Sequence, residues 1–222
     1  MDKRIFLVAF IFLFVLISFV NIKSETTPQV TIEKGWNLVT YSTFSGIGDA
    51  ETYFAKNPMW VLNPIDKKYY GGIGNDAERS IADMFETFDD DFLYSQAFWI
   101  YSDEGFKVPL GGPSANEDSL KKIYFLYEGW NLIAPQGFMN GLFLDDFDGD
   151  CSVKKIYGFD GDNQKWIDAS FLISNEGRFD GLLFSDGSRA ADLGIGLAIK
   201  VENNCQFDFL GNSGTSGPPV LP

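Results

Sequence analysis

Histidine is absent from this chain of 222 residues, and cysteine occurs only twice, as Cys151 and Cys205. Without histidine there is no Ser-His-Asp or Cys-His catalytic machinery and no histidine-ligated zinc. Two cysteines are also too few for a zinc or iron–sulfur site built on four thiolates. Carboxylates are therefore the acid–base groups that the chain has in number.

Positive charge is also scarce. The chain has 17 Lys and Arg against 31 Asp and Glu, a formal net charge of −14. Such a surface repels nucleic-acid phosphates and anionic lipid headgroups. We therefore expect no nucleic-acid partner and no peripheral docking on a membrane, and we interpret the acidic surface as a solvated one.

The longest apolar run lies at the N-terminus, where residues 5–20 follow Lys3 and Arg4. As a helix these residues would span about 24 Å, short of a hydrocarbon core of roughly 30 Å. The pattern is typical of a secretory signal peptide or a signal anchor over residues 1–24, with residues 5–22 as the membrane anchor if the segment is retained. Both interpretations predict an exported protein, extracellular or at the cell surface, whose membrane contact is limited to this segment.

Export bears on the expected redox state of the two cysteines. In an oxidising compartment Cys151 and Cys205 are expected to form one disulfide, which closes a loop of 54 residues. The chain-entropy model gives such a bridge a stabilisation of about 4 kcal/mol. A pair of free buried thiols is the alternative in a reducing compartment.

Aromatic residues and glycine are abundant, with 22 Phe, 9 Tyr, 5 Trp and 23 Gly, which favours β-structure joined by tight turns. The chain also contains an internal repeat, whose offset drifts from 94 to 99 residues as loop insertions would make it. Three segments return in the same order: residues 33–39 as 127–133, 60–69 as 157–166, and 98–110 as 197–209. The sequence therefore predicts two copies of one module.

The small, polar segment at residues 113–119 is a linker by composition. It separates module 1 (residues 25–112) from module 2 (residues 120–211), and the composition of residues 212–222 predicts a disordered tail. We expect a mainly β fold of the β-rich α+β class. It would comprise two tandem small β-sandwich or barrel-like domains with short helices, preceded by the N-terminal hydrophobic helix.

Within module 1 the pattern predicts short helices over residues 49–56 and 80–88 and a buried aromatic strand over residues 97–101. It also predicts a β-hairpin that turns at residues 63–66. The counterpart in module 2 turns at residues 160–163, whose sequence Asp-Gly-Asp-Asn is a strong hairpin signal.

The segments Gly35-Trp36-Asn37-Leu38 and Gly129-Trp130-Asn131-Leu132 are each followed by an aromatic strand and by a hairpin that returns through Lys and Tyr or Trp. This ordered set resembles the tandem "GWNL" repeats of secreted and surface-anchored bacterial and archaeal proteins. The resemblance covers residues 30–211, although Leu197-Ala198 stands where the family has an aromatic pair. It implies extracellular placement. The family has no settled activity and no catalytic residues that carry over.

One acidic segment is a candidate calcium site. Asp146, Asp148 and Asp150 are spaced so that their carboxylates can point in one direction, and calcium prefers such hard oxygen ligands. The segment is not an EF-hand, because Tyr157 stands at position 12 where the glutamate belongs. A solvated acidic turn is the alternative. We expect no other cofactor.

The aromatic residues offer a second candidate site. The five tryptophans stand mostly inside apolar runs, so we predict that they belong mainly to the core. Tyr69, Tyr70, Tyr101 and Trp166 lie near hairpin turns, where exposed flat rings would stack on the faces of sugars. Structural packing of these four rings is the alternative.

The sequence therefore favours a non-catalytic, exported cell-surface or envelope protein that acts in adhesion or surface structure. Its expected partner is a cell-envelope protein or polysaccharide. A pair of carbohydrate-binding modules is the first alternative, and a carboxylate-based glycoside hydrolase is the second. The hydrolase is disfavoured because the Asp and Glu residues stand in turns, and two small modules offer little room for an enclosed catalytic cleft.

Overall fold

A computed structural model of the chain describes residues 29–40, 47, 53, 55–86, 88, 92–109, 124–136, 139, 141–174, 176–179 and 195–209. The predicted N-terminal segment, the linker, the tail and most of the helix predicted at residues 49–56 lie outside these residues. In the described part of the chain, no helix combines the length and the apolar content that a membrane crossing needs.

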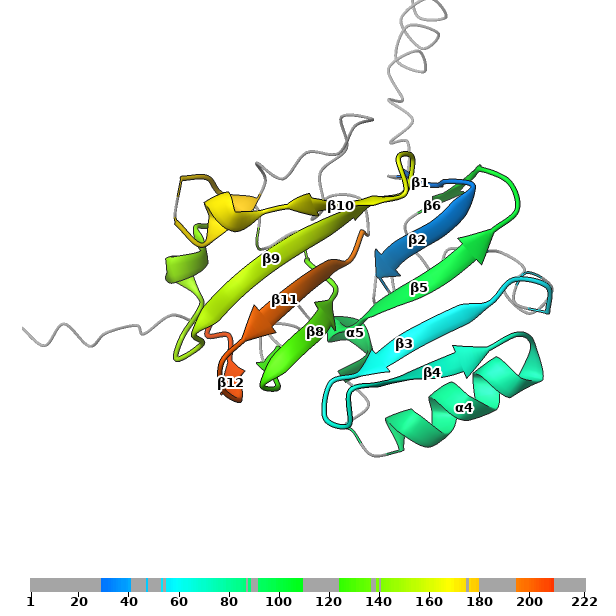
Figure 1. Cartoon of the computed structure of the whole chain (residues 1–222), viewed down its shortest axis with the longest axis horizontal. Coiled ribbons are helices and arrows are strands. Elements are labelled where there is room, and N and C mark those ends of the chain that lie inside the picture. Colours follow the sequence, from blue (N-terminus) through cyan, green and yellow to red (C-terminus); the bar gives the residue numbers. More distant parts are fainter. Residues whose placement is uncertain are drawn as a thin grey trace, which may run out of the picture.

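The predicted mainly β fold is confirmed, with four antiparallel sheets and few helices (Figure 1). In the first half, the described residues form strands β1 (Gln29–Ile32), β2 (Gly35–Thr40), β3 (Met59–Asn63), β4 (Lys68–Gly72), β5 (Ala97–Ser102) and β6 (Phe106–Pro109). β1 pairs with β6, and the other four strands form a sheet in the order β2-β5-β3-β4.

The second half follows the same plan. Its strands are β7 (Phe125–Leu126), β8 (Gly129–Ile133), β9 (Val153–Asp160), β10 (Lys165–Asp168), β11 (Leu197–Val201) and β12 (Cys205–Gln206). β7 pairs with β12, and the other strands form a sheet in the order β8-β11-β9-β10. Strand for strand, this is the order of the first half. The two predicted hairpins are present as β3–β4 and β9–β10.

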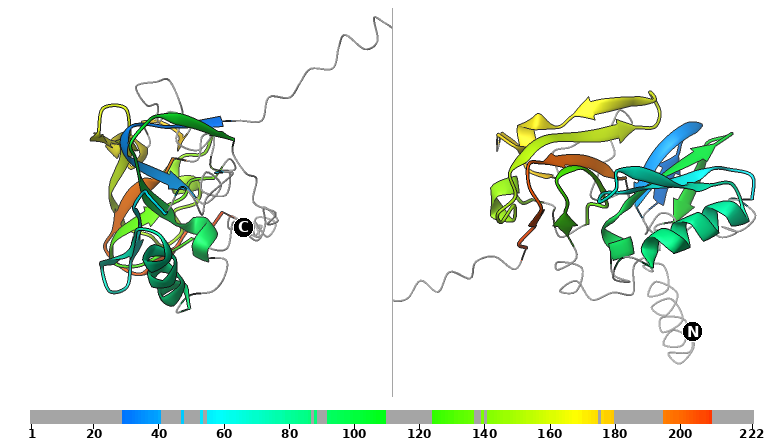
Figure 2. Two further views of the ribbon diagram at one scale, coloured as in Figure 1. Left: turned by 90° about the vertical axis from the view of Figure 1, so that its right-hand side faces the viewer. Right: turned by 60° about the horizontal axis from the view of Figure 1, so that its bottom comes forward.

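In the described part of the first half, α-helices flank the four-stranded sheet. α4 (Asn75–Phe85) packs along β4 and β3, and the short α5 (Phe92–Ser95) precedes β5 (Figure 2). The second half has short 3-10 helices instead, η2 (Leu144–Asp146) and η3 (Ser170–Leu172). The helix predicted over residues 80–88 thus begins earlier and ends sooner. Gly74 adopts a left-handed backbone (φ 60°) in the short turn after β4. Because this turn ends at Gly74, α4 begins at the next residue.

Each four-stranded sheet turns one face toward a core of its own. In the first half, β1 and β6 contribute Val30, Ile32 and Val108 to this core, where they meet Val61 and Phe98 of the sheet. In the second half the equivalent core includes residues of β7, β11 and β12 together with those of η2 and η3. Each half therefore has a core built mainly from its own residues, although Ile195 of the second half also packs against the first core.

The repeated Gly-Trp-Asn-Leu segment begins the first strand of each four-stranded sheet, directly after the turn that leads into it. Asn37 closes the turn with its side chain, because Nδ2 donates to Glu33 O and Oδ1 accepts from Glu33 N–H, both at 2.8 Å. Asn131 makes the same two bonds with the backbone of Tyr127, at 2.7 and 2.9 Å. The asparagine of the repeat is therefore a structural residue in both halves.

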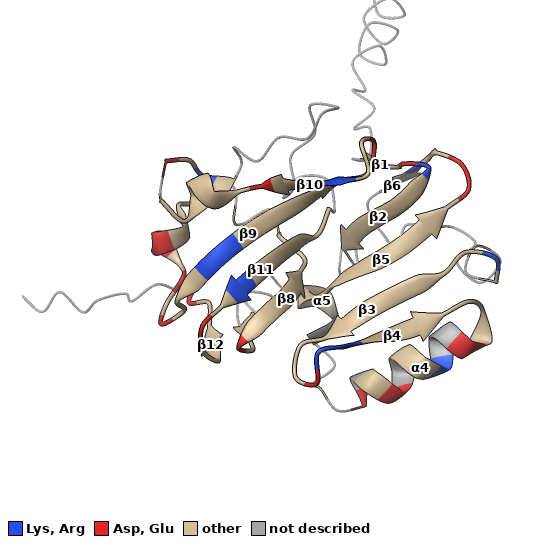
Figure 3. Cartoon of the chain, viewed as in Figure 1, with Lys and Arg blue, Asp and Glu red and all other residues tan. Residues whose placement is uncertain are grey.

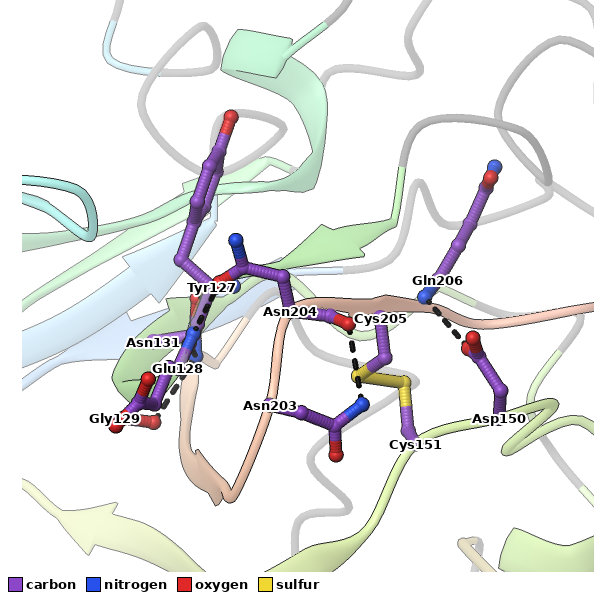
Figure 4. The surroundings of a disulfide bond; sticks show 10 residues. All are labelled: Tyr127, Glu128, Gly129, Asn131, Asp150, Cys151, Asn203, Asn204, Cys205 and Gln206. Carbon is purple, nitrogen blue, oxygen red and sulfur yellow. Dashed lines mark hydrogen bonds between the residues drawn. A yellow bond between two sulfur atoms is a disulfide. The ribbon is translucent and has the colours of Figure 1, made fainter.

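The predicted disulfide between Cys151 and Cys205 is confirmed, with a Cα–Cα distance of 5.1 Å (Figure 4). It joins the start of β12 to the segment directly before β9, so it links two strands of one half. Both cysteines are buried in the second core, and no described cysteine is free. Such a bridge is typical of a protein that folds in an oxidising compartment.

Candidate functional site

The second face of each sheet carries aromatic side chains. Successive residues of a strand point to opposite faces, so Trp36 and Leu38 lie on the face opposite Val39, which belongs to the first core. In the same way Trp130 and Leu132 lie opposite Ile133 of the second core. The two aromatic faces adjoin each other, because the two sheets lie side by side (Figure 1).

A third apolar cluster joins the two halves at this junction. It contains one group from each half: Leu38, Leu62 and Ala97 from the first, and Leu132, Phe159 and Ala198 from the second. Two isolated β-bridges flank it, Val39 to Ile195 and Gln96 to Ile133. In the repeat, Val39 corresponds to Ile133 at an offset of 94 residues, and Gln96 corresponds to Ile195 at an offset of 99. Each bridge is therefore the repeat counterpart of the other. The halves therefore contact each other reciprocally, as two subunits do across a two-fold axis.

The two hairpin turns make the same reciprocal contact. Lys67 and Gln164, 97 residues apart, occupy equivalent positions and share a left-handed backbone, with φ of 60° and 49°. The Gln164 side chain bonds to both backbone groups of Trp36, accepting from N–H at 2.8 Å and donating to C=O at 2.9 Å. Lys67 Nζ donates to the backbone oxygen of Glu128. The turn of the second half thus binds Trp36 in β2, and the turn of the first half binds Glu128, the residue before β8.

Two clefts open along this junction. The Trp130 cleft, of about 720 Å³, is lined by Trp130, Tyr157, Trp166, Ala198, Leu62, Lys67, Tyr69, Gly129 and Leu132. The Trp36 cleft, of about 610 Å³, is lined by Trp36, Trp60, Tyr69, Trp99, Phe159 and Gln164. Both volumes lie in the range of small-molecule sites. Tyr69 lines both clefts, so they are neighbours on one surface.

The clefts are copies of one another. Every residue of the Trp36 cleft has its repeat counterpart in the Trp130 cleft: Trp36 and Trp130, Trp60 and Tyr157, Tyr69 and Trp166, Trp99 and Ala198, Phe159 and Leu62, Gln164 and Lys67. Each cleft takes residues from both halves. The site is therefore a product of the packing between the halves and not of either half alone.

The prediction that the tryptophans belong mainly to the core is wrong for Trp36 and Trp130. They are 36% and 37% exposed, because they stand on the sheet face that the other half covers only in part. Trp166, which was also predicted to be an exposed ring near a hairpin turn, is 46% exposed. Trp60 and Trp99 are partly buried and line the Trp36 cleft. Strand alternation gave no warning of the exposure of Trp36 and Trp130, since it places the polar Asn37 and Asn131 on the opposite face, where they bond to the backbone of the preceding turn.

The four predicted sugar-stacking residues divide into three groups. Tyr69, which is 52% exposed, and Trp166 line the clefts. Tyr101 borders the Trp36 cleft through its ring contact with Trp36, at 5.4 Å between centroids. Tyr70 lies on the opposite sheet face, packs against the first core and donates its hydroxyl to Asp66 at 2.6 Å. The structure therefore brings three of the four to one surface.

The cleft walls are apolar and aromatic, and among the described residues no carboxylate lines them. Lys67 is the charged residue of the Trp130 cleft. Partial burial lowers the pKa of its ammonium group, and the charge of Glu128 opposes that shift. A third cavity, lined partly by Glu33, Asp160 and Asp162, measures about 30 Å³, room for about one water molecule. The geometry therefore suits binding of an apolar or ring-shaped surface rather than acid–base chemistry.

The three aspartates of the candidate calcium site do not converge. Asp146 accepts a hydrogen bond from Phe143 N–H at 2.7 Å, and Asp150 faces Gln206 N–H at 3.3 Å beside the disulfide (Figure 4). Partial burial of the Asp148 carboxyl raises its pKa, and repulsion from the charge of Asp145 raises it further by a smaller amount. Among the described residues, the one group close enough to share an ion is Asp150 with the two disulfide cysteines, which are not thiolates. Calcium binding stays a prediction.

Comparison of the chain with protein-family models, with curated proteins and with solved structures finds no match. The class of the protein is therefore defined by its fold and its surface. It is a mainly β protein whose two similar halves form a paired aromatic cleft between them.

Proposed function

We propose that this chain is an exported, non-catalytic cell-surface protein that binds carbohydrate through its two β-modules, in adhesion or in the structure of the cell envelope. The observation that carries the proposal is the convergence of exposed aromatic rings from both halves on one surface, lined by Trp36, Trp130, Trp166 and Tyr69. Large exposed apolar patches on soluble domains mark interaction sites.

The chemistry of the surface favours a sugar over a compact apolar ligand. The C–H groups of a pyranose form flat apolar faces that suit aromatic rings, while its hydroxyls need polar partners at the edges. Neighbouring rings are inclined to one another, from 41° between Trp130 and Tyr157 to 87° between Trp99 and Trp166. Such a surface offers several ring faces along its length. Lys67 and Gln164 supply the polar edge groups.

Export is supported by the disulfide, by the apolar N-terminal run and by the resemblance to GWNL repeats. The tandem repeats of that resemblance fit the two halves with equal strand order. A glycoside hydrolase is not supported, because a pair of carboxyl groups about 5–10 Å apart would have to face the substrate. No such pair lines either cleft in the described part of the chain.

The test is binding of the purified full chain, in mild detergent, to a panel of neutral and acidic polysaccharides, measured by pull-down and by calorimetric titration. Trp36→Ala, Trp130→Ala and Trp166→Ala should each weaken binding at least about tenfold, as expected for an aromatic side chain that the bound ligand covers. Phe125→Ala is the matched control, because Phe125 is also exposed (40%) but lines neither cleft. Retention of no polysaccharide, or equal losses for Phe125→Ala, would refute the proposal.

A further inference from the structure

Two lysines extend the Trp130 cleft on the same sheet face. In the sheet of the second half, Lys200 of β11 stands between Trp130 of β8 and Lys155 of β9, and it pairs with both. Its neighbours Ile199 and Val201 belong to the second core, so the Lys200 side chain lies on the cleft face with Ala198. Directly paired residues have their Cβ atoms about 5 Å apart, within reach of one ligand.

The equivalent row beside the Trp36 cleft carries no charge. At offsets of 99 and 97 residues, the counterparts of Lys200 and Lys155 are Tyr101 and Pro58. Tyr101 N–H donates to Pro58 O at 3.1 Å, so the two residues are paired as the lysines are. The cleft-lining Lys67 likewise has the neutral counterpart Gln164. Each of the three lysines around the Trp130 cleft thus has an uncharged counterpart around the Trp36 cleft.

The lysines are available to a ligand. Lys155 and Lys200 are exposed, and in the described part of the chain neither forms a salt bridge. Lys154, the neighbour of Lys155, is instead paired with Glu202 at 3.0 Å. Figure 3 shows the basic segments of β9 and β11 side by side, while β2 and β5 carry none. Asp168 of β10 pairs with Tyr157 and interacts electrostatically with Lys155, so one carboxylate lies beside the lysines. Because charges are screened over about 8 Å at physiological salt, Lys155 and Lys200 with the cleft-lining Lys67 still leave a local excess of positive charge at this cleft.

We propose that the two clefts have different ligand selectivity: the Trp130 cleft binds an acidic sugar residue, and the Trp36 cleft binds an uncharged one. This inference rests on the proposed carbohydrate binding. The sugar ring stacks on Trp130, and its acidic group lies against Lys200 and Lys155. The ligand of the whole surface is an anionic polysaccharide, bearing carboxylate or sulfate groups.

The experiment compares polymers that differ only in charge. The full chain in mild detergent is titrated with polygalacturonate and with its carboxyl-reduced, uncharged form, and in a second arm with dextran sulfate and dextran. We expect at least one acidic polymer to bind about fivefold more tightly than its neutral form, the effect of two exposed charge pairs. The arm in which this occurs identifies the acidic group as carboxylate or sulfate. The preference should shrink as salt rises.

The variant Lys155→Gln/Lys200→Gln should lose the preference and keep the affinity for the neutral polymer. Lys107→Gln is the matched control, because the exposed Lys107 lies in β6 of the first half, outside the sheet that carries the Trp130 cleft, and it should keep the preference. All three lysines are exposed, so folding is expected to persist, and thermal unfolding checks it. A preference that survives in the double variant overturns the inference, as does tighter binding of the neutral polymers, and the proposed function then stands. Binding of no polymer overturns both.

Discussion

Gln164 lies 128 residues from Trp36 in the sequence, yet its side-chain amide bonds to both backbone groups of Trp36, at 2.8 and 2.9 Å. Trp36 stands in β2, an edge strand of the first sheet. Edge strands expose unpaired backbone groups that invite other chains. Gln164 covers these groups at Trp36 and holds the hairpin of one half against the sheet of the other.

Replacing this amide should loosen the junction. Gln164→Ala removes both hydrogen bonds to the Trp36 backbone, together with those from Nε2 to Lys34 O and Gly161 O, so we expect a loss of about 1–2 kcal/mol in the free energy of unfolding. Gln164→Glu is the informative comparison: it keeps an acceptor for Trp36 N–H but sets a carboxylate oxygen against backbone carbonyl oxygens, so it should lose at least as much. Chemical denaturation measures both. Equal stability of Gln164→Ala and the unaltered chain would contradict this role.

Gly196 stands where the two halves meet most closely. Its N–H donates to Leu38 O at 2.8 Å, and a Cβ on it would lie 2.3 Å from Ala97 Cβ. Gly196→Ala should therefore push the halves apart and cost about 1–3 kcal/mol, as overpacking does. Gly105→Ala is the control, since its nearest contact would be 3.5 Å, and it should change the stability by less than about 0.5 kcal/mol. A tolerated Gly196→Ala, measured by thermal unfolding, would mean that the junction adjusts easily.

The disulfide should stabilise the second half. Replacing both Cys151 and Cys205 by Ser opens a loop of 54 residues and should cost about 4 kcal/mol in the chain-entropy model. Denaturation of the unaltered chain with and without reductant provides the comparison, and reduction should reproduce the loss seen in the variant. If neither treatment lowers the stability by more than about 1 kcal/mol, the constraint on the unfolded chain is not the main effect of the bridge.

Asp148 should destabilise the folded protein at neutral pH. Because partial burial and the charge of Asp145 raise its pKa, the folded state holds the proton more tightly than the unfolded state does. The penalty is complete above the raised pKa and is relieved as the pH falls through it. Asp148→Asn should therefore raise the melting temperature at pH 7, by about 1 °C.

Asp145→Asn should give part of the same gain, since it removes the repulsion. A melting temperature that falls in Asp148→Asn would contradict the argument. Calcium adds a second comparison. If the loop of Asp146, Asp148 and Asp150 binds the ion, calcium should raise the melting temperature of the unaltered chain and have less effect on Asp148→Asn.

Local patterns in the sequence predicted much of the fold. The hairpin turns at residues 63–66 and 160–163 were recognisable from their turn residues, and the cysteine pair followed from the count of two. The start of α4 was misplaced, because polar residues at the beginning of a helix resemble a loop in the sequence. The sequence predicted only part of the cleft lining. Tyr69 and Trp166 were proposed from their positions near turns, whereas Trp36 and Trp130 were assigned to the core.

The sequence by itself determined the repeat, the mainly β elements and the disulfide, because each depends on residues close in the chain or on a simple count. Strand alternation even determined that Trp36 and Trp130 share a face with Leu38 and Leu132. Only the tertiary structure decided how far that face is covered. Burial of a sheet face depends on where the other half packs, and that is set by contacts such as Gln164 with Trp36 and Gly196 with Leu38, between residues more than a hundred positions apart.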